Sequence, residues 1–124
     1  MHRILKPNGK LLIGVPNVKG INSRIAKGYW YYLGAPVHTF NYSANNLKML
    51  LEKNNFICKK IRYVSSSNGI LGSLEIYMNR NGGMPKRKAK LLRSWLVRKV
   101  ANIVAKIENL MKTGDCIEIE VTKK

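Results

Sequence analysis

The segment HRILKPNGKLLIGVPN, residues 2–17, decides how the rest of the chain is interpreted. Its middle, Lys6 to Lys10, is predicted to be a tight turn, because Pro presets one backbone dihedral and Asn-Gly tolerates positive φ. Leu11 to Val15 then form an apolar run without alternation, which is typical of a strand covered on both faces between helix layers. The residues before the turn look like the last turn of a helix.

The size and charge of the chain limit its class. A length of 124 residues suits one domain, and a hydrophobic fraction of 45% argues against wholesale disorder. With 23 Lys and Arg against 6 Asp and Glu, the formal net charge is +17. Such an excess attracts polyanions, either phosphate backbones or an anionic membrane surface. A general bias of the composition toward Lys explains the charge equally well.

The cysteine and histidine residues do not follow a metal-binding pattern. Cys58 and Cys116 are far apart, and their spacing to His2 and His38 does not resemble a metal site. We interpret them as buried free thiols in a reducing compartment. No apolar run approaches the roughly 20 residues of a membrane span, and the N-terminus lacks the apolar core of a signal peptide. The expected location is the cytoplasm, with peripheral attachment to a membrane as an option.

Residues 18–42 are predicted to be a long structured loop on the substrate side, with a short helical piece near Asn22 to Lys27. Loops of this length in a compact domain usually serve a site. The loop holds most of the aromatic residues of the chain: Tyr29, Trp30, Tyr31, Tyr32, Phe40 and Tyr42. These form either a satellite core beneath the loop or a binding platform.

Three elements follow the loop. Ser43 is the predicted N-cap of an amphipathic helix that ends at Asn55, with Leu47, Leu50 and Leu51 on its apolar side. Residues 56–64 are predicted to form a strand at a sheet edge, since the adjacent Lys59 and Lys60 interrupt its alternation. Helical spacing of apolar residues predicts a short helix over residues 70–80, after a polar turn over 65–69.

Residues 86–112 are predicted to form one basic amphipathic helix, which Gly114 ends. The segment carries nine Lys and Arg and one acid, Glu108. Its apolar residues fall on one stripe, Leu92, Leu96, Val100, Ile103, Ile107 and Leu110. We expect this stripe to face the core with a solvated basic back; the alternative is a helix that lies on an anionic membrane or in a partner's groove. A short strand is predicted over residues 117–121.

Two blocks of sequence form a pattern with the last segment. The first block consists of His2, Arg3, Leu5, Lys6, Pro7, Gly9, Pro16 and Asn17, and the second of Pro36, His38, Phe40, Ser43, Leu47, Leu50, Leu51 and Phe56. The pattern resembles the C-terminal half of class I S-adenosylmethionine-dependent methyltransferases. The ending GDCIEIEVTKK, residues 114–124, is similar to the last strand of the family. Together they span essentially the whole chain.

The resemblance implies an α/β chain with a partial Rossmann-like methyltransferase fold, a small mixed sheet of about three strands, and helices. In the family the last strand inserts antiparallel between the fifth and sixth strands. We therefore expect residues 116–121 to lie between residues 11–15 and 56–64. Glu118 and Glu120 would then point to a face that the long helix does not cover.

The resemblance also implies that the intact enzyme uses S-adenosylmethionine. The family binds this cofactor on a glycine-rich loop after its first strand, and the chain contains neither GxGxxG nor GxGxG. We therefore expect residues 1–124 to be a single domain, the C-terminal portion of a methyltransferase domain. It would lack the N-terminal cofactor-binding half, be inactive alone and hold no cofactor by itself. The segment before the turn would be the end of the helix that precedes the family's fifth strand.

The candidate site residues lie on the acceptor side. His38 is the one candidate for a catalytic base, because an imidazole suits proton removal at neutral pH; the alternative is that it fixes the loop by hydrogen bonding. Asn17 follows the carboxyl end of a strand, where such sheets place ligands, and would either contact the acceptor or shape the turn. Tyr29, Trp30, Tyr31 and Tyr42 are candidate walls of the acceptor pocket.

Several partners and one alternative function follow from the same features. An unpaired edge of the strand at residues 11–15 would be covered by the missing half, by a partner chain or in a homodimer. The alternative function is a basic binding module that docks on an anionic membrane surface through residues 86–112. Nucleic acid is the less favoured partner, because the sequence contains no recognised nucleic-acid-binding module.

Overall fold

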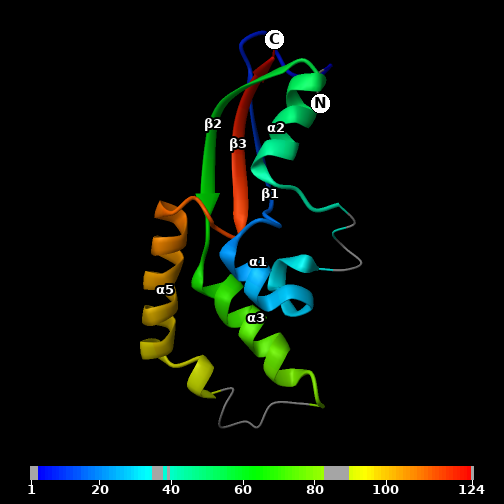
Figure 1. Ribbon diagram of the computed structural model, residues 1–124. Coiled ribbons are helices and arrows are strands. Elements are labelled where there is room, and N and C mark those ends of the chain that lie inside the picture. The colour runs from blue at the N-terminus through cyan, green and yellow to red at the C-terminus, as the bar shows by residue number, and fades with distance from the viewer. Residues whose placement is uncertain (1–2, 35–37, 39, 83–89, 124) are drawn as a thin grey trace.

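The computed structural model describes residues 3–34, 38, 40–82 and 90–123, and contains a three-stranded sheet (Figure 1). The strands are β1 (Lys10–Pro16), β2 (Phe56–Val64) and β3 (Cys116–Lys123), in the order β1-β3-β2. β3 is antiparallel to both neighbours. The predicted α/β class, the three strands and the central place of the last strand are confirmed. The pairing within the sheet is antiparallel throughout, so the prediction of a mixed sheet is wrong.

The helices divide between two ends of an elongated molecule. α2 (Ala44–Lys53) packs beside the sheet, whereas α1 (Ile21–Ala26), α3 (Ser67–Asn79) and α5 (Trp95–Leu110) lie beyond its other end (Figure 1). Two short 3-10 helices, η1 (Lys27–Tyr29) and η2 (Tyr31–Leu33), follow α1. The segment predicted as a long loop is therefore partly helical in its first half. Of its second half, residues 35–37 and 39 lie outside the described residues.

The core lies between α2 and one face of the sheet. Ile117, Ile119 and Val121 of β3 are fully buried, and Leu47 and Leu51 of α2 pack against them. Ser43 caps α2 as predicted, because its hydroxyl oxygen accepts a hydrogen bond from the backbone N–H of Asn46. The predicted amphipathic helix is thus confirmed, and its apolar side holds the sheet.

The opposite face of the sheet is open to solvent in the described structure. Glu120 pairs with Lys10 at 2.9 Å, and Glu118 pairs with Arg62 at 3.2 Å, both across neighbouring strands. Leu12 of β1 points to the same face and is 55% exposed. The expectation that Glu118 and Glu120 face an uncovered side is confirmed. The prediction that the strand after the turn is covered on both faces is wrong.

Among the described residues, β1 and β2 are the edge strands of the sheet. A turn precedes β1. The predicted turn is confirmed, since Gly9 N–H donates to the Lys6 carbonyl oxygen at 2.9 Å and Asn8 has a φ of 61°. Arg3 and Ile4 lie in a turn and not in a helix, so the expected helix end is not present there. β2 is an edge strand, as its interrupted alternation predicted.

The third and fifth helices differ from their predicted bounds. α3 begins at Ser67, in the stretch predicted to be a polar turn, because Gly69 and Ser73 pack against the segment of η2. The predicted continuous helix over residues 86–112 is wrong: among the described residues, 90–92 are helical, Arg93 and Ser94 interrupt, and α5 starts at Trp95. Residues 86–89 lie outside the described residues.

The end of α5 also differs from the prediction. The helix stops at Leu110, and Lys112 adopts the left-handed conformation with a φ of 57°. Gly114 lies beyond this cap and is packed against the backbone of Val64. The role of Gly114 is therefore close packing, not termination of the helix.

Candidate functional site

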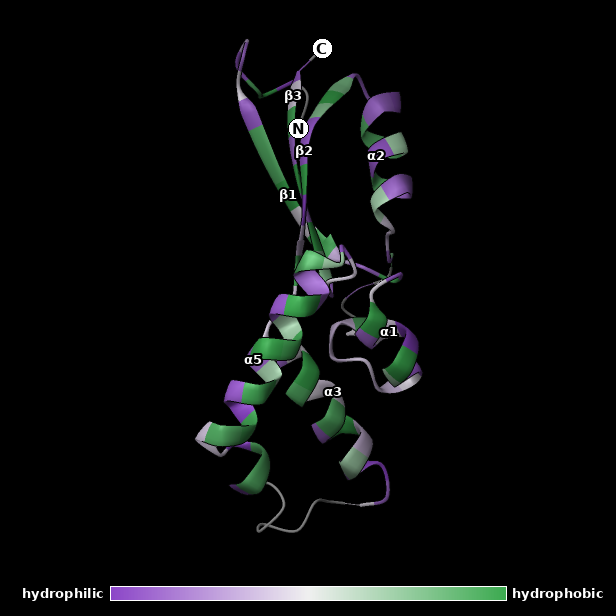
Figure 2. Cartoon of the chain, turned by 60° about the vertical axis from the view of Figure 1, so that its left-hand side comes forward, coloured by the Kyte–Doolittle hydropathy of each residue, from purple (hydrophilic) through white to green (hydrophobic). Residues whose placement is uncertain are grey.

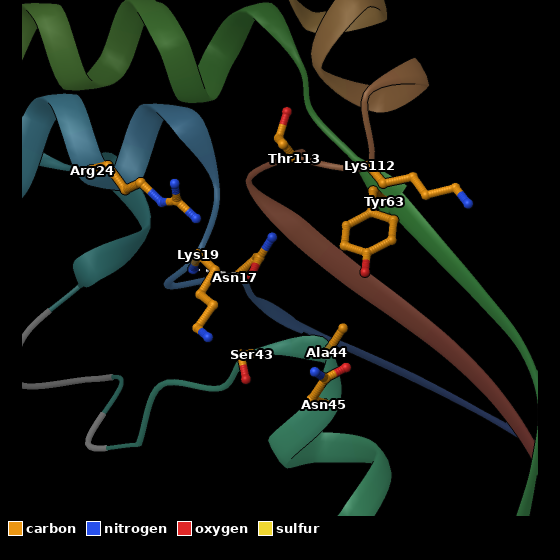
Figure 3. Close-up of a pocket in the computed structure, with 9 residues that line it drawn as sticks. All are labelled: Asn17, Lys19, Arg24, Ser43, Ala44, Asn45, Tyr63, Lys112 and Thr113. Atoms are coloured by element: carbon orange, nitrogen blue, oxygen red, sulfur yellow. Dashed lines mark hydrogen bonds between the residues drawn. The ribbon is translucent and has the colours of Figure 1, made fainter.

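A cavity of about 190 Å³ lies where the sheet meets the helical end of the molecule (Figure 3). β1 ends at this point, α2 begins there, and the turn between α5 and β3 passes beside it. The cavity is lined by Asn17, Lys19, Arg24, Ser43, Ala44, Asn45, Tyr63, Lys112 and Thr113. We call it the basic cavity.

Asn17 fixes the wall of the basic cavity at the end of β1. Its backbone N–H donates to the Asp115 carbonyl oxygen at 2.7 Å, and its side-chain amide donates to the Gly114 carbonyl oxygen at 2.8 Å. Its side-chain oxygen accepts from the backbone N–H of Lys19 at 3.1 Å. Asn17 is buried and its polar groups are satisfied, so it shapes the turn and lines the cavity at the same time.

The first residues of α2 form another wall. Ser43, Ala44 and Asn45 line the cavity, so the amino end of a ten-residue helix is directed at it. The first backbone N–H groups of a helix have no partner within the helix, and the helix dipole makes this end positive. The wall therefore favours an anion.

Three basic side chains add to this potential. Lys19, Arg24 and Lys112 line the cavity, and none of the other described residues that line it is acidic. None of the three forms an ion pair with another residue of the described ranges. Figure 3 shows Arg24 reaching from α1 toward Lys19, whereas the ammonium end of Lys112 extends outward. The arrangement can bind a phosphate or carboxylate group by charge and by hydrogen bonds.

The structure does not unite the predicted acceptor-pocket residues in one site. Tyr29 and Tyr31 line a second, more apolar cavity of about 630 Å³ against α3. Trp30 is buried and donates from its indole N–H to Asp115 at 2.9 Å. Tyr42 packs on the core, and its carbonyl oxygen accepts from the N–H of Val18 at 3.1 Å. Of the five candidates, only Asn17 lines the basic cavity.

His38, the candidate base, is exposed and lines neither cavity. Its backbone N–H donates to the Gly34 carbonyl oxygen at 3.2 Å, and a Cβ added to Gly34 would lie 2.7 Å from the imidazole Cδ2. Gly34 has a φ of 52°. This hydrogen bond comes from the backbone, so both roles predicted for the imidazole stay predictions.

A buried polar network beneath the basic cavity was missed by sequence reasoning. Asp115 is fully buried, and its carboxylate accepts hydrogen bonds from Trp30 and from the Asn22 side chain, at 2.9 and 3.0 Å. Ser65 connects Asp115 to a second acid, Glu108. Its hydroxyl donates to Glu108 at 2.5 Å and accepts from the backbone N–H of Asp115 at 2.8 Å. The network connects α1, α5 and β3, which gives it a structural role.

This network predicts an unusual dependence of stability on pH. Burial raises the pKa of the Glu108 and Asp115 carboxyl groups above their ordinary values. The folded chain therefore holds protons that the unfolded chain releases, between the ordinary pKa and the raised one. The free energy of unfolding should rise as the pH falls from the raised pKa toward the ordinary carboxyl pKa, measured by urea denaturation in high salt.

Glu108→Gln should flatten this dependence, because the amide is neutral at every pH and its oxygen still accepts from Ser65. Glu52→Gln is the control, since it removes an exposed carboxylate from α2. If the free energy of unfolding instead fell as the pH was lowered, in the unmodified chain or in Glu108→Gln, the assignment of raised pKa values to the buried carboxyl groups would be wrong.

Neither metal binding nor membrane spanning is indicated within the described part of the chain. Residues 3–34, 38, 40–82 and 90–123 contain no group of three His, Cys, Asp or Glu that is placed to hold a metal ion. Cys58 and Cys116 are free and half-buried, and burial with the nearby Asp115 raises the pKa of the Cys116 thiol to about 11. No helix of these ranges is long and apolar enough to cross a bilayer.

Comparison with known proteins does not assign a family. No protein-family model matches the sequence, and no curated protein is significantly similar to it.

Proposed function

We propose that the chain forms the acceptor side of an S-adenosylmethionine-dependent methyltransferase, and that its acceptor carries an anionic group. The basic cavity carries this proposal, because it lies at the carboxyl end of β1. β1 and β2 run in the same direction on the two sides of β3 and end at the same edge. The carboxyl ends of parallel strands are where open α/β sheets place ligands. The β1-β3-β2 order agrees with the strand arrangement that the resemblance implies.

The basic cavity does not fit the cofactor. S-adenosylmethionine supplies a methyl group from a positively charged sulfonium. Lys19, Arg24 and Lys112 would repel that charge, and about 190 Å³ is small for a ligand that includes an adenosine. The proposal therefore gives the basic cavity the acceptor and assigns cofactor binding to other residues.

The acceptor would be held by its anionic group. The Ala44 and Asn45 N–H groups at the start of α2 and the guanidinium of Arg24 would donate to its oxygens, and Lys19 adds charge. The hydroxyl of Tyr63 points into the cavity from β2 (Figure 3). Anchoring one end of the acceptor in this way would fix the distance from its reacting atom to the methyl donor, which is the main contribution a protein makes to such a transfer.

Charge reversal at the cavity tests the binding step. Titration of the chain with inorganic phosphate should shift the amide NMR signals of Ala44 and Asn45. The double variant Lys19→Glu and Arg24→Glu should weaken this binding by about tenfold or more, since two charge-assisted contacts are lost. The double variant Lys6→Glu and Lys59→Glu changes the net charge equally at exposed positions away from the cavity and should leave the affinity unchanged.

Methyl transfer tests the function itself. The protein expressed from its complete reading frame is incubated with methyl-labelled S-adenosylmethionine and a panel of phosphorylated and carboxylated small molecules. We expect label in an anionic acceptor, strongly reduced by the cavity variant and not by the control variant. The proposal of an anionic acceptor would be wrong if label were transferred only to neutral acceptors. It would also be wrong if the cavity variant and the control variant lost the same share of activity. If residues 1–124 alone bound S-adenosylhomocysteine at one site per chain, the proposal that this chain holds only the acceptor would be wrong.

A further inference from the structure

The proposed function does not use the outward face of α5. α5 packs on α3 and β2, and its buried residues are the small Ala101 and Ala105 together with Glu108. The stripe that was predicted to face the core instead points away from it. It consists of Leu96, Val100, Ile103, Ile107 and Leu110, which we call the outer stripe.

The outer stripe is continuous and strongly exposed. Its members are spaced by three and four residues, so they lie on one side of the helix over about 21 Å. Leu110 is 83% exposed, Leu96 64% and Val100 55%. Trp95 and Met111 extend the apolar surface at the two ends of the stripe. Figure 2 shows α5 at the outside of the molecule, with hydrophobic residues prevalent along it. Exposed apolar surface of this extent marks an interaction site.

The charges around the stripe are of one sign. Lys99 lies between Leu96 and Ile103 on the helix surface, and Lys106 lies between Ile103 and Leu110, so both border the stripe on the same side. The one acid of α5, Glu108, is buried and bonded to Ser65. The surface that α5 presents is therefore apolar and cationic, without an exposed carboxylate.

We propose that α5 lies in the interface of an anionic membrane, with the outer stripe in the acyl region and the two lysines at the headgroups. An apolar stripe bordered by lysines is the arrangement that interfacial helices use. A nucleic acid would match the lysines but would leave the apolar stripe against phosphates. A second copy would match the stripe, but it would bring two chains of charge +17 together. The proposal is independent of the methyltransferase proposal.

Binding of the whole chain to vesicles tests the proposal. The chain is sedimented with large unilamellar vesicles of phosphatidylcholine, with and without about 30% phosphatidylserine. We expect binding to the anionic vesicles and little to the neutral ones. Trp95 is 73% exposed and Trp30 is buried, so the fluorescence of Trp95 should shift to the blue on binding.

Two variants separate the apolar from the ionic contribution. Ile103→Asn with Ile107→Asn removes the centre of the stripe at exposed positions, and should abolish measurable binding. Lys99→Glu with Lys106→Glu should weaken it by about thirtyfold or more, since each basic residue at an anionic surface contributes about fivefold. Lys6→Glu with Lys59→Glu is the charge-matched control and should bind like the unmodified chain.

The other occupants of the stripe are measured in parallel. Sedimentation velocity of the unmodified chain reports self-association, and a filter assay with single-stranded RNA reports nucleic-acid binding. Equal binding to neutral vesicles, or equal loss in the charge-matched control, overturns the proposal. So does a stripe variant that dissociates a dimer or releases RNA while vesicle binding is unchanged.

Discussion

Ile119→Ala should lower the free energy of unfolding by about 4 kcal/mol, the largest loss expected from a single truncation in this chain. Ile119 is 0% exposed at the middle of the central strand. Ile13 of β1 and Ile61 of β2 lie opposite it in the register, so all three strands contribute to the layer around this side chain. A cavity there cannot be filled by movement of one element alone, because both neighbouring strands are held by β3.

The measurement is urea denaturation followed by circular dichroism, and Leu12→Ala is the matched control. Leu12 belongs to the same sheet but points to its open face, so its truncation should cost less than about 1 kcal/mol. Comparable losses in the two variants would mean that the open face is covered in solution. That outcome would direct attention to a partner on the sheet face that carries Glu118 and Glu120.

The parts of the fold that were predicted correctly depend on local patterns. Ser43 with the leucines that follow it specifies α2, because capping and a 3.6-residue period are properties of one segment. The central place of β3 came from the resemblance and agrees with its alternation, in which Ile117, Ile119 and Val121 are buried while Glu118 and Glu120 face the open side. A strand with one covered face shows this period of two.

The predictions that were wrong concern which face of a strand or helix packs against the rest of the chain. Leu11 to Val15 lack alternation, yet Leu12 faces solvent because no described element covers that side. In α5 the large apolar residues point outward, since Ala101 and Ala105 allow closer approach to the neighbouring elements than leucine or isoleucine would. The periodicity of one helix defines its stripe but not the direction in which the stripe points.

The candidate site was predicted only in part for the same reason. Asn17 was predicted as a site residue because its place after the end of a strand follows from the local sequence alone. Lys19, Arg24 and Lys112 are individually ordinary among 23 basic residues, and only the fold brings them to one cavity. The sequence left open whether the aromatic residues form a satellite core or a binding platform. Trp30 is a core residue because it donates to the buried Asp115, a contact between residues 85 positions apart.

Gly114→Ala should destabilise the chain by about 3 kcal/mol and should also disturb the basic cavity. A Cβ at this position would lie 2.8 Å from the backbone N of Val64 and 3.0 Å from its carbonyl carbon. These are backbone atoms of β2 and cannot rotate aside, so the turn before β3 must move. The Gly114 carbonyl oxygen accepts a hydrogen bond from the side chain of Asn17. A shift of Gly114 would therefore displace Asn17, which lines the cavity.

Gly14→Ala is the control for this substitution, because a Cβ there meets nothing within 4 Å. It should change the free energy of unfolding by less than about 0.5 kcal/mol, or increase it by restricting the unfolded chain. Phosphate titration of both variants, under conditions in which each is folded, then connects stability to the site. We expect weaker phosphate binding in Gly114→Ala alone, and unchanged binding in a folded Gly114→Ala chain would show that Asn17 does not shape the basic cavity.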